Sequence, residues 1–352
     1  MNNKELLNIL ILTLVKESGS DIHLVTKSSP ILRIHGELIT VSRLDILKSS
    51  DTIDLLREMT NDSQYQDFVN NKQLDFSYTH AGEYRLRGNA FMQSGEVTIT
   101  LRLVTKVKTI SDLSLPKELL EFSAKKQGFF LVVGPVGQGK STTIAAMIDN
   151  INQKEKRMIM TIEDPVEYIH ENKNSIIMQR EVGFDVNDFN SGLIGALRQD
   201  VDVIFIGEMR DSATMSAAVT AAETGHLVFS TLHTNSASQT IDRIIDSFPS
   251  GQQDQIRTQL ASSLLGIFSQ RLLPKVGGGQ VPVYELLVSN TAVQNLIREK
   301  RIFEIDRIIE TGGDMGMISF DRCLADLVRK GEVPLDEAMK YAKYSKVFEQ
   351  MI

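Results

Sequence analysis

The sequence predicts an α/β protein in which a small α+β domain precedes a larger domain built on a parallel sheet. In residues 1–104, short β-type runs alternate with turn signals such as Ala81-Gly82, which is typical of antiparallel strands with short loops. From Lys117 onward, apolar strands alternate with helical patterns, which is typical of a parallel sheet with crossover helices. We therefore expect four parts, at residues 1–104, 105–116, 117–290 and 291–352.

The small domain should begin with a buried helix. The apolar run Leu6–Val15 is only ten residues long, short of the roughly 20 needed to cross a bilayer. No small-residue cleavage site follows it, which favours a core helix over a signal peptide or an anchor. The later elements should be strands at Ile22–Val25, Ile31–Ile34 and Glu37–Val41, helices at Ser42–Thr60 and Asp62–Asn70, and strands at Leu74–Thr79, Tyr84–Met92 and Glu96–Leu103.

Residues 105–116 are polar, end in Pro116, and should form the linker between the domains. In the domain at 117–290, nearly continuous apolar runs should be strands covered on both faces, at Gly128–Val133, Arg157–Ile162, Val203–Gly207 and Leu227–Leu232. The rest of the chain should be helical, at Thr291–Lys300, Arg301–Thr311, Ser319–Lys330 and Leu335–Ala342.

Composition excludes several classes of protein. Hydrophobic residues make up 42% and charged residues 24%, which excludes a disordered or fibrous chain. A net charge of −7 argues against a global basic field that would attract nucleic acid or anionic lipid. The single cysteine, Cys323, excludes a disulfide framework and a structural zinc module.

A phosphate-binding motif follows the apolar strand GFFLVV and opens a helix. The segment GPVGQGKS fits GxxxxGK[ST] in full, and its glycines let backbone N–H groups turn toward phosphate at a helix N-terminus. Lys140 should reach the β- and γ-phosphates, and the Ser141 hydroxyl should ligate Mg²⁺. The predicted nucleoside-triphosphate site comprises Gly134, Pro135, Val136, Gly137, Gln138, Gly139, Lys140, Ser141 and Thr142.

Other polar groups adjoin the strands of the same predicted sheet. Glu163 follows the strand MIMTI, Glu208 follows VIFI, and His226 and His233 flank LVFSTL. Ligand groups gather at strand ends in open α/β sheets, and a carboxylate there can orient or deprotonate an attacking water. Taken singly, such carboxylates can instead cap helices, and a lone histidine can be a core or surface group.

The predicted small domain carries three arginines just before the linker. Arg85 and Arg87 are two residues apart and therefore share a strand face, and Arg102 lies on the next predicted strand. They form either a solvated strand surface or an arginine clamp supplied to the phosphates across a domain or subunit interface.

Four ordered segments resemble the secretion ATPase superfamily of type II secretion and type IV pilus motors. GPVGQGKSTT, TIEDPVEY, LRQDVDVIFIGEMRD and TGHLVFSTLHTNSA resemble its Walker A, Asp box, Walker B and His box. The resemblance covers nearly the whole chain and implies a RecA-like P-loop ATPase domain. SDIHL at Ser20–Leu24 and RLRGNAF at Arg85–Phe91 resemble the family's PAS-like N-terminal domain.

The resemblance also implies residue roles. Glu208 would be the catalytic carboxylate, and Glu163 a helper near Mg²⁺ or water. His233 would sense the γ-phosphate, with His226 close by. The family's N-terminal domain supplies arginines to the nucleotide site at the positions of Arg85, Arg87 and Arg102. The Walker B segment departs from the usual Gln-Asp-Pro-Asp, because it has Val201 in place of the proline.

Within the family, the chain resembles the retraction branch, the PilT-like twitching-motility ATPases. With one cysteine and residues 1–104 ahead of the linker, we expect neither the tetracysteine insertion nor the additional N-terminal domains that are typical of extension and type II secretion ATPases. The segment Ala292–Arg298 resembles that branch's AIRNLIRE, although Val293 and Gln294 depart from it. The same segment also fits an amphipathic helix that packs on the core.

The resemblance implies a cytoplasmic homohexamer, peripheral at the inner face of the inner membrane, that uses ATP and Mg²⁺ to depolymerise a type IV pilus. Its partners would be an inner-membrane platform protein and a paralogous retraction ATPase, with no direct nucleic-acid contact. Mg-ATP would bind between the two domains, with adenine contacts around Val104–Leu113. The alternatives are an accessory PilU-like motor, a pilus-assembly or DNA-uptake motor, a nucleic-acid translocase, and a nucleotide-binding regulator that does not hydrolyse ATP.

Overall fold

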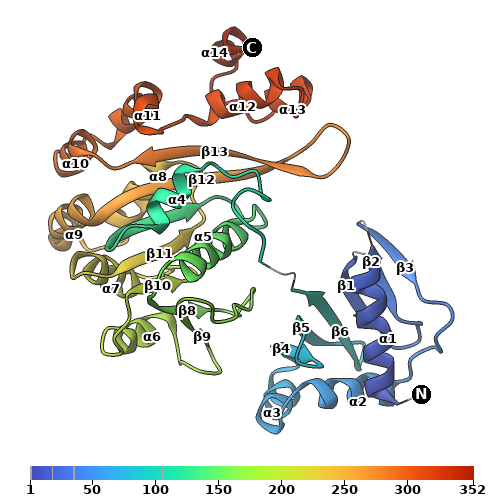
Figure 1. The fold of residues 1–352 in the computed structure, drawn as a ribbon. Helices are drawn as coiled ribbons and strands as arrows, with labels where there is room; N and C mark the ends of the chain where they lie inside the picture. Colours follow the sequence, from blue (N-terminus) through green and yellow to red (C-terminus); the bar gives the residue numbers. More distant parts are fainter. Residues whose placement is uncertain (1, 18, 35, 105–106) are drawn as a thin grey trace. The chain divides into compact units, whose positions relative to one another are not determined.

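The computed structural model describes residues 2–17, 19–34, 36–104 and 107–352. The chain divides into two compact units (Figure 1). The first comprises residues 1–106 and the short segment 167–169, and the second comprises residues 107–166 and 170–352. The expected fold class is confirmed, with an α/β P-loop unit, a smaller α+β unit and C-terminal helices. In the described ranges, no helix has both the length and the apolar character that a membrane span needs.

The first unit is an antiparallel sheet packed on helices. Within the described residues it has six strands in the order β3-β2-β1-β6-β5-β4. The strands are β1 (Gly19–Leu24), β2 (Ile31–Ile34), β3 (Glu37–Thr40), β4 (Gln73–His80), β5 (Tyr84–Gln93) and β6 (Glu96–Leu103). The helices are α1 (Asn3–Lys16), α2 (Ser49–Met59) and α3 (Asp62–Asn71).

Helix α1 confirms the buried helix that the apolar spacing predicts. Leu7, Leu10, Ile11 and Leu14 are fully buried against the sheet, as residues at helical spacing on one face should be. The helix predicted at Ser42–Thr60 is wrong at its start, because residues 42–44 form a turn and residues 45–48 have no regular structure. Their backbone pairs with the loop after β1, where Leu47 N donates to Ser28 O at 3.0 Å, so α2 begins only at Ser49.

The second unit is built on a mixed sheet with the order β13-β12-β7-β11-β10-β8-β9 among the described residues. Neighbouring strands run parallel except at the edge pair β12 and β13, which is antiparallel. The strands are β7 (Gly128–Val133), β8 (Met158–Glu163), β9 (Ile176–Glu181), β10 (Val203–Ile206), β11 (Leu227–Leu232), β12 (Leu264–Pro274) and β13 (Gln280–Val288).

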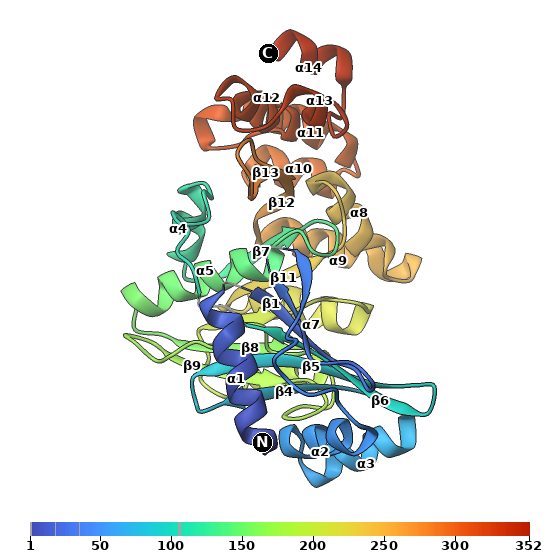
Figure 2. The ribbon, with the colours of Figure 1, turned by 90° about the vertical axis from the view of Figure 1, so that its right-hand side faces the viewer.

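Helices cover both faces of this sheet (Figure 2). Phe129, Leu131 and Val133 of β7 pack in one core with the helices α6, α7, α8 and α9, whereas Phe130 and Val132 pack in another with α4 and α5. This alternation explains why β7 is buried along its whole length. The helices are α4 (Glu118–Ser123), α5 (Lys140–Lys154), α6 (Phe189–Ala196), α7 (Ser212–Glu223), α8 (Ala237–Asp246) and α9 (Ser250–Ser263).

The C-terminal region is helical, as the sequence predicts. Its elements are α10 (Thr291–Arg298), η1 (Ile302–Glu304), α11 (Ile305–Thr311), η2 (Gly313–Met315), α12 (Phe320–Arg329), α13 (Leu335–Met339) and α14 (Ser345–Met351). Helix α12 packs on β13, and Phe348 of α14 is buried in the same cluster, so these helices extend the core of the second unit.

The expected linker is shorter than residues 105–116. Residues 105–106 lie outside the described residues, whereas residues 107–116 belong to the second unit. Ile110 and Leu115 are buried there against α4 and the sheet. The segment was predicted to be a linker because most of its residues are polar, and this pattern does not indicate that Ile110 and Leu115 are buried.

Candidate active site

The parallel strands of the second unit bring the predicted polar groups to one edge of the sheet. Val133 of β7 lies opposite Leu232 of β11, and Ile206 of β10 lies opposite Ile162 of β8. The residues at or just after the ends of these strands are therefore neighbours at the carboxyl edge, where open α/β sheets collect their ligand groups. They are Gly134, His233, Gly207-Glu208 and Glu163.

The phosphate-binding motif forms a loop between β7 and α5. Gly134, Gly137 and Gly139 have φ values of +146°, +76° and +77°, a region that side chains with a Cβ rarely adopt. Gly139 is the N-cap of α5, so the loop ends at a helix N-terminus whose first N–H groups favour an anion. Ser141 and Thr142 lie half-buried in the first helical turn, while Val136 at the tip is 79% exposed.

A chain of polar contacts joins the loop to two other strand ends. The buried Lys140 Nζ donates to Gly134 O at 2.8 Å and Pro135 O at 2.9 Å, and lies 3.2 Å from His233 Nδ1. His233 Nε2 lies 3.3 Å from Glu208 Oε2. Because an ammonium group only donates, His233 accepts at Nδ1 and donates from Nε2 to the Glu208 carboxylate. The imidazole therefore connects the lysine of the loop to the predicted catalytic carboxylate.

Arg210 completes this chain, although the sequence pattern gave it no role. Its guanidinium pairs with the Glu208 carboxylate, and this hydrogen bond raises the pKa of Arg210 above its ordinary value. Glu208 thus accepts from a histidine on one side and an arginine on the other. Its position in the sequence could have indicated this role, because Arg210 lies two residues after Glu208, just beyond the same strand.

Glu163 lies at the end of β8 and is almost completely buried. Its Oε1 accepts from Thr161 Oγ1 at 2.7 Å and from Gln179 Nε2 at 3.3 Å. These two neighbours orient the carboxylate at the same edge of the sheet. Its role as a helper near Mg²⁺ or water stays a prediction.

His226 lies at the other end of its strand. It precedes β11, its carbonyl accepts from Gly128 N at the start of β7, and its Nδ1 lies 3.0 Å from Ala221 O. Strand β11 rises roughly 3.3 Å per residue over six residues, so His226 is separated from the carboxyl edge by the length of the strand. The prediction that His226 lies close to the phosphates is therefore wrong for the loop of its own chain.

The predicted arginines belong to the first unit. Arg85 Nη1 donates to Thr79 Oγ1 at 2.9 Å, and Arg102 Nε donates to the buried Asp21 at 2.8 Å. Arg87 lies directly across from Arg102 in the register of β5 and β6. Their part in a nucleotide site stays a prediction.

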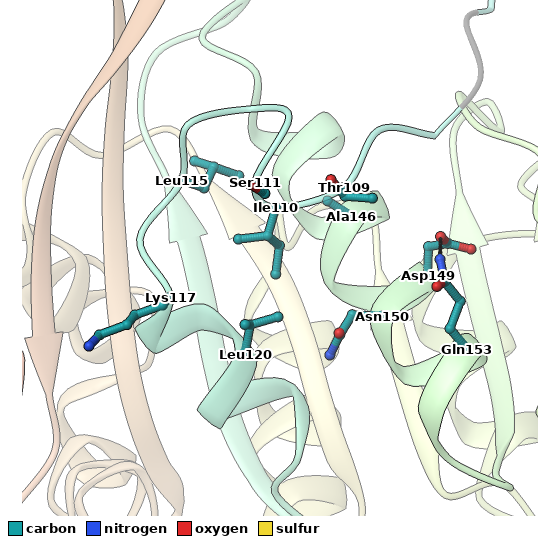
Figure 3. Close-up of a pocket in the computed structure, with 10 residues that line it drawn as sticks. All are labelled: Thr109, Ile110, Ser111, Leu115, Lys117, Leu120, Ala146, Asp149, Asn150 and Gln153. Atoms are coloured by element: carbon teal, nitrogen blue, oxygen red, sulfur yellow. Dashed lines mark hydrogen bonds between the residues drawn. The ribbon is translucent and has the colours of Figure 1, made fainter.

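A cavity of about 350 Å³ lies beside α5 in the second unit (Figure 3). Ile110, Leu115 and Leu120 line one wall, and Ala146 and Asn150 of α5 line the other. Ala146 is six residues beyond Lys140, or roughly 9 Å along the helix at 1.5 Å per residue. The cavity takes in part of the segment in which adenine contacts are expected, and that expectation remains untested.

The donor set fits a magnesium nucleotide. Mg²⁺ usually takes one or two protein oxygens and completes its octahedron with water and phosphate. Ser141 offers a hydroxyl in the first turn of α5, next to the lysine of the loop. Among the described residues, His, Cys, Asp and Glu side chains form no group of three that could hold a metal by themselves.

Known proteins resemble this chain in sequence and in fold. A family model described as type II/IV secretion system protein matches residues 3–278. The type IV pilus retractation ATPase PilT of Pseudomonas aeruginosa is 41% identical over 95% of this chain and 97% of its own length. The type IV pilus ATPase PilU of the same organism is 35% identical over 97% of this chain and 90% of its own. A crystal structure of the pilus retraction motor PilT with bound ADP is 43% identical, covers 99% of both chains, and has a TM-score of 0.91.

Proposed function

The chain belongs to the type II/IV secretion system protein family, and from that membership we propose that it is an ATP-hydrolysing motor that retracts type IV pili. The observation that carries the proposal is the contact chain Lys140–His233–Glu208 in a chain that matches a retraction ATPase over 95% of its length. Fold alone would not suffice, because P-loop folds serve many activities.

The polar residues at the carboxyl edge of the sheet have distinct roles in ATP hydrolysis. The N–H groups of the loop and Lys140 bind the phosphates, and the Ser141 hydroxyl would hold Mg²⁺, which would supply charge neutralisation at the phosphates. Glu208 orients the attacking water and accepts its proton, a contribution of typically 10²–10⁴ in rate. His233 contacts both Lys140 and Glu208, so loss of the γ-phosphate near the lysine is transmitted to the carboxylate.

Six finer features belong to the same proposal. The motor is a homohexamer, it acts at the cytoplasmic face of the inner membrane through a platform protein, and a paralogous ATPase assists it. Arg85, Arg87 and Arg102 complete the nucleotide site from the first unit of the same or a neighbouring subunit. Glu163 assists at Mg²⁺ or water, and His226 acts at a nucleotide only through a neighbouring subunit. The family resemblance and the residue types support these features.

Steady-state ATP turnover of the purified full chain tests the motor. We expect a hexameric mass by light scattering and turnover that requires Mg²⁺ and disappears in EDTA. A monomer that binds ATP and never hydrolyses it would instead support the non-hydrolysing regulator. Salt-sensitive binding to DNA that accelerates turnover would support a nucleic-acid translocase.

Deletion of the gene in its own bacterium separates the pilus motors from one another. A retraction motor predicts cells that keep their surface pili and lose twitching. Loss of the pili themselves would indicate an assembly motor. Pili with only partly reduced twitching would indicate an accessory, PilU-like motor. Complementation with Glu208→Gln should reproduce the deletion if hydrolysis drives the output.

A further inference from the structure

A buried glutamine on β12 contacts the phosphate loop on the side that faces the sheet. Gln270 is 2% exposed and lies on the strand that pairs with β7. Its Nε2 donates to Gln138 O at 2.7 Å, and its Oε1 accepts from Thr143 Oγ1 at 2.7 Å. One side-chain amide therefore joins the loop just before Lys140 to the helix just after it.

The direction of this amide is determined by its partners. A backbone carbonyl only accepts, so the NH₂ group of Gln270 must face Gln138 O, and its oxygen is left for the Thr143 hydroxyl. An amide of this length satisfies both partners at once. A hydrocarbon satisfies neither, and a carboxylate has no donor for the carbonyl.

The neighbouring backbone holds the same loop closely. Leu272 N donates to Gln138 Oε1 at 2.6 Å, so the side chain of this loop residue points to β12. A Cβ on Gly134 would lie 2.3 Å from Gln270 O, which shows how closely the start of the loop approaches the strand. The loop is therefore held against β12 at Gly134, Gln138 and, through α5, at Thr143.

We propose that Gln270 is a positioning residue for nucleotide binding, an inference that rests on the function proposed above. In a trans peptide the C=O and the next N–H point in opposite directions. Because Gln270 holds the Gln138 carbonyl toward β12, the Gly139 N–H points away from the strand, into the loop. Without that bond the peptide can rotate and present its carbonyl oxygen to the phosphates, where it repels them.

The experiment titrates the purified full chain with a fluorescent mant-ADP and measures ATP turnover and melting temperature alongside. Gln270→Met keeps the length of the side chain and removes both hydrogen bonds. The matched control is Asn152→Leu, because Asn152 is also a fully buried amide that bridges two backbone groups, Glu171 O and Lys173 N. It lies near the far end of α5, so its loss should lower stability alone.

We expect Gln270→Met to weaken mant-ADP binding about tenfold and to raise the KM for ATP, with a smaller change in kcat. Gln270→Glu should weaken binding at least as much, because its carboxylate faces the Gln138 carbonyl. Asn152→Leu should melt earlier and bind mant-ADP within about twofold of wild type. Thr143→Ala removes one partner only, is milder for folding, and should weaken binding about threefold.

The inference is overturned if Gln270→Met, or Thr143→Ala where the former does not fold, binds mant-ADP within about twofold of wild type. It is also overturned if Asn152→Leu loses as much affinity, because the effect would then be general destabilisation. A wild-type chain that binds no nucleotide would overturn the proposed function and this inference together. If the wild type binds mant-ADP and the variants bind it equally well, only the inference about Gln270 is overturned.

Discussion

The two sheets of the molecule distribute their charged groups in opposite ways. In the second unit, parallel strands end at one edge, so Lys140, His233 and Glu208 contact one another although they lie far apart in sequence. In the first unit, antiparallel strands spread the arginines along β5 and β6, and Arg102 is held by its own neighbour, Asp21. A parallel sheet thus brings groups from several strands together at one edge, whereas the antiparallel sheet leaves its arginines along the lengths of its strands.

The largest effect on nucleotide binding should come from removing the lysine of the phosphate loop, which begins the contact chain Lys140–His233–Glu208. Lys140→Ala removes the buried ammonium that bonds to Gly134 O, Pro135 O and His233. We expect ADP affinity to fall roughly thousandfold, about 4 kcal/mol, because a desolvated charge pair is lost. Isothermal titration calorimetry measures it, and affinity within tenfold of wild type would show that the loop binds phosphate without its lysine.

A second effect, on the pH dependence of stability, should arise from a buried carboxyl group at the start of α8. Glu285 of β13 accepts from Ala237 N at 2.8 Å, at the start of α8. Its pKa is raised from 4.5 to about 7, mainly by burial; the hydrogen bond from Ala237 N and the charge of Lys343 oppose the rise, and the charge of Asp306 adds to it. Because the folded chain keeps this proton at pH values where the unfolded chain has lost it, stability should fall as pH rises from 4.5 to 7.

Glu285→Gln tests this second effect, because glutamine keeps the acceptor for Ala237 N and cannot ionise. At pH 8 the variant should be more stable than wild type by about 3 kcal/mol, and at pH 4.5 the two should be alike. Urea unfolding at both pH values measures the difference. An equal gap at the two pH values would exclude ionisation of Glu285 as its cause.

A smaller effect, on kcat, should come from substituting Arg102 of the first unit or its partner Asp21. Arg102→Ala should lower kcat about tenfold and leave ADP affinity nearly unchanged, because the arginine is expected to act on charge that develops in the transition state. Asp21→Asn keeps Arg102 and weakens only its anchor, so it should lower kcat by about threefold. If both variants keep wild-type kcat, the arginines are only a solvated strand surface.

The phosphate loop could be predicted from the sequence because its chemistry is local. Glycines at positive φ, a lysine and a hydroxyl at a helix N-terminus all lie within Gly134–Ser141. The four central strands could be predicted because both faces are buried, which leaves continuous apolar runs. Strand β9 has no such run, since Ile176 is exposed and Gln179, Arg180 and Glu181 follow.

Other features depend on tertiary neighbours and could not be predicted. Strands β12 and β13 carry buried polar residues, Ser269, Gln270 and Glu285, which interrupt the apolar pattern. The partners of Gln270 are 127 and 132 positions away, so no local signal marks it. The position of His226 was implied only by the family resemblance, whereas the predicted strand Leu227–Leu232, which the structure confirms as β11, already separates it from His233.

The most direct test of the account is nucleotide binding and turnover of Glu208→Gln measured on the same sample. Glutamine keeps the shape of the side chain beside His233 and Arg210 but cannot take a proton from water. We predict ADP affinity within about threefold of wild type and ATP turnover lowered at least about 100-fold. Turnover near the wild-type rate would contradict the account, because the contact chain would then not lead to the catalytic carboxylate.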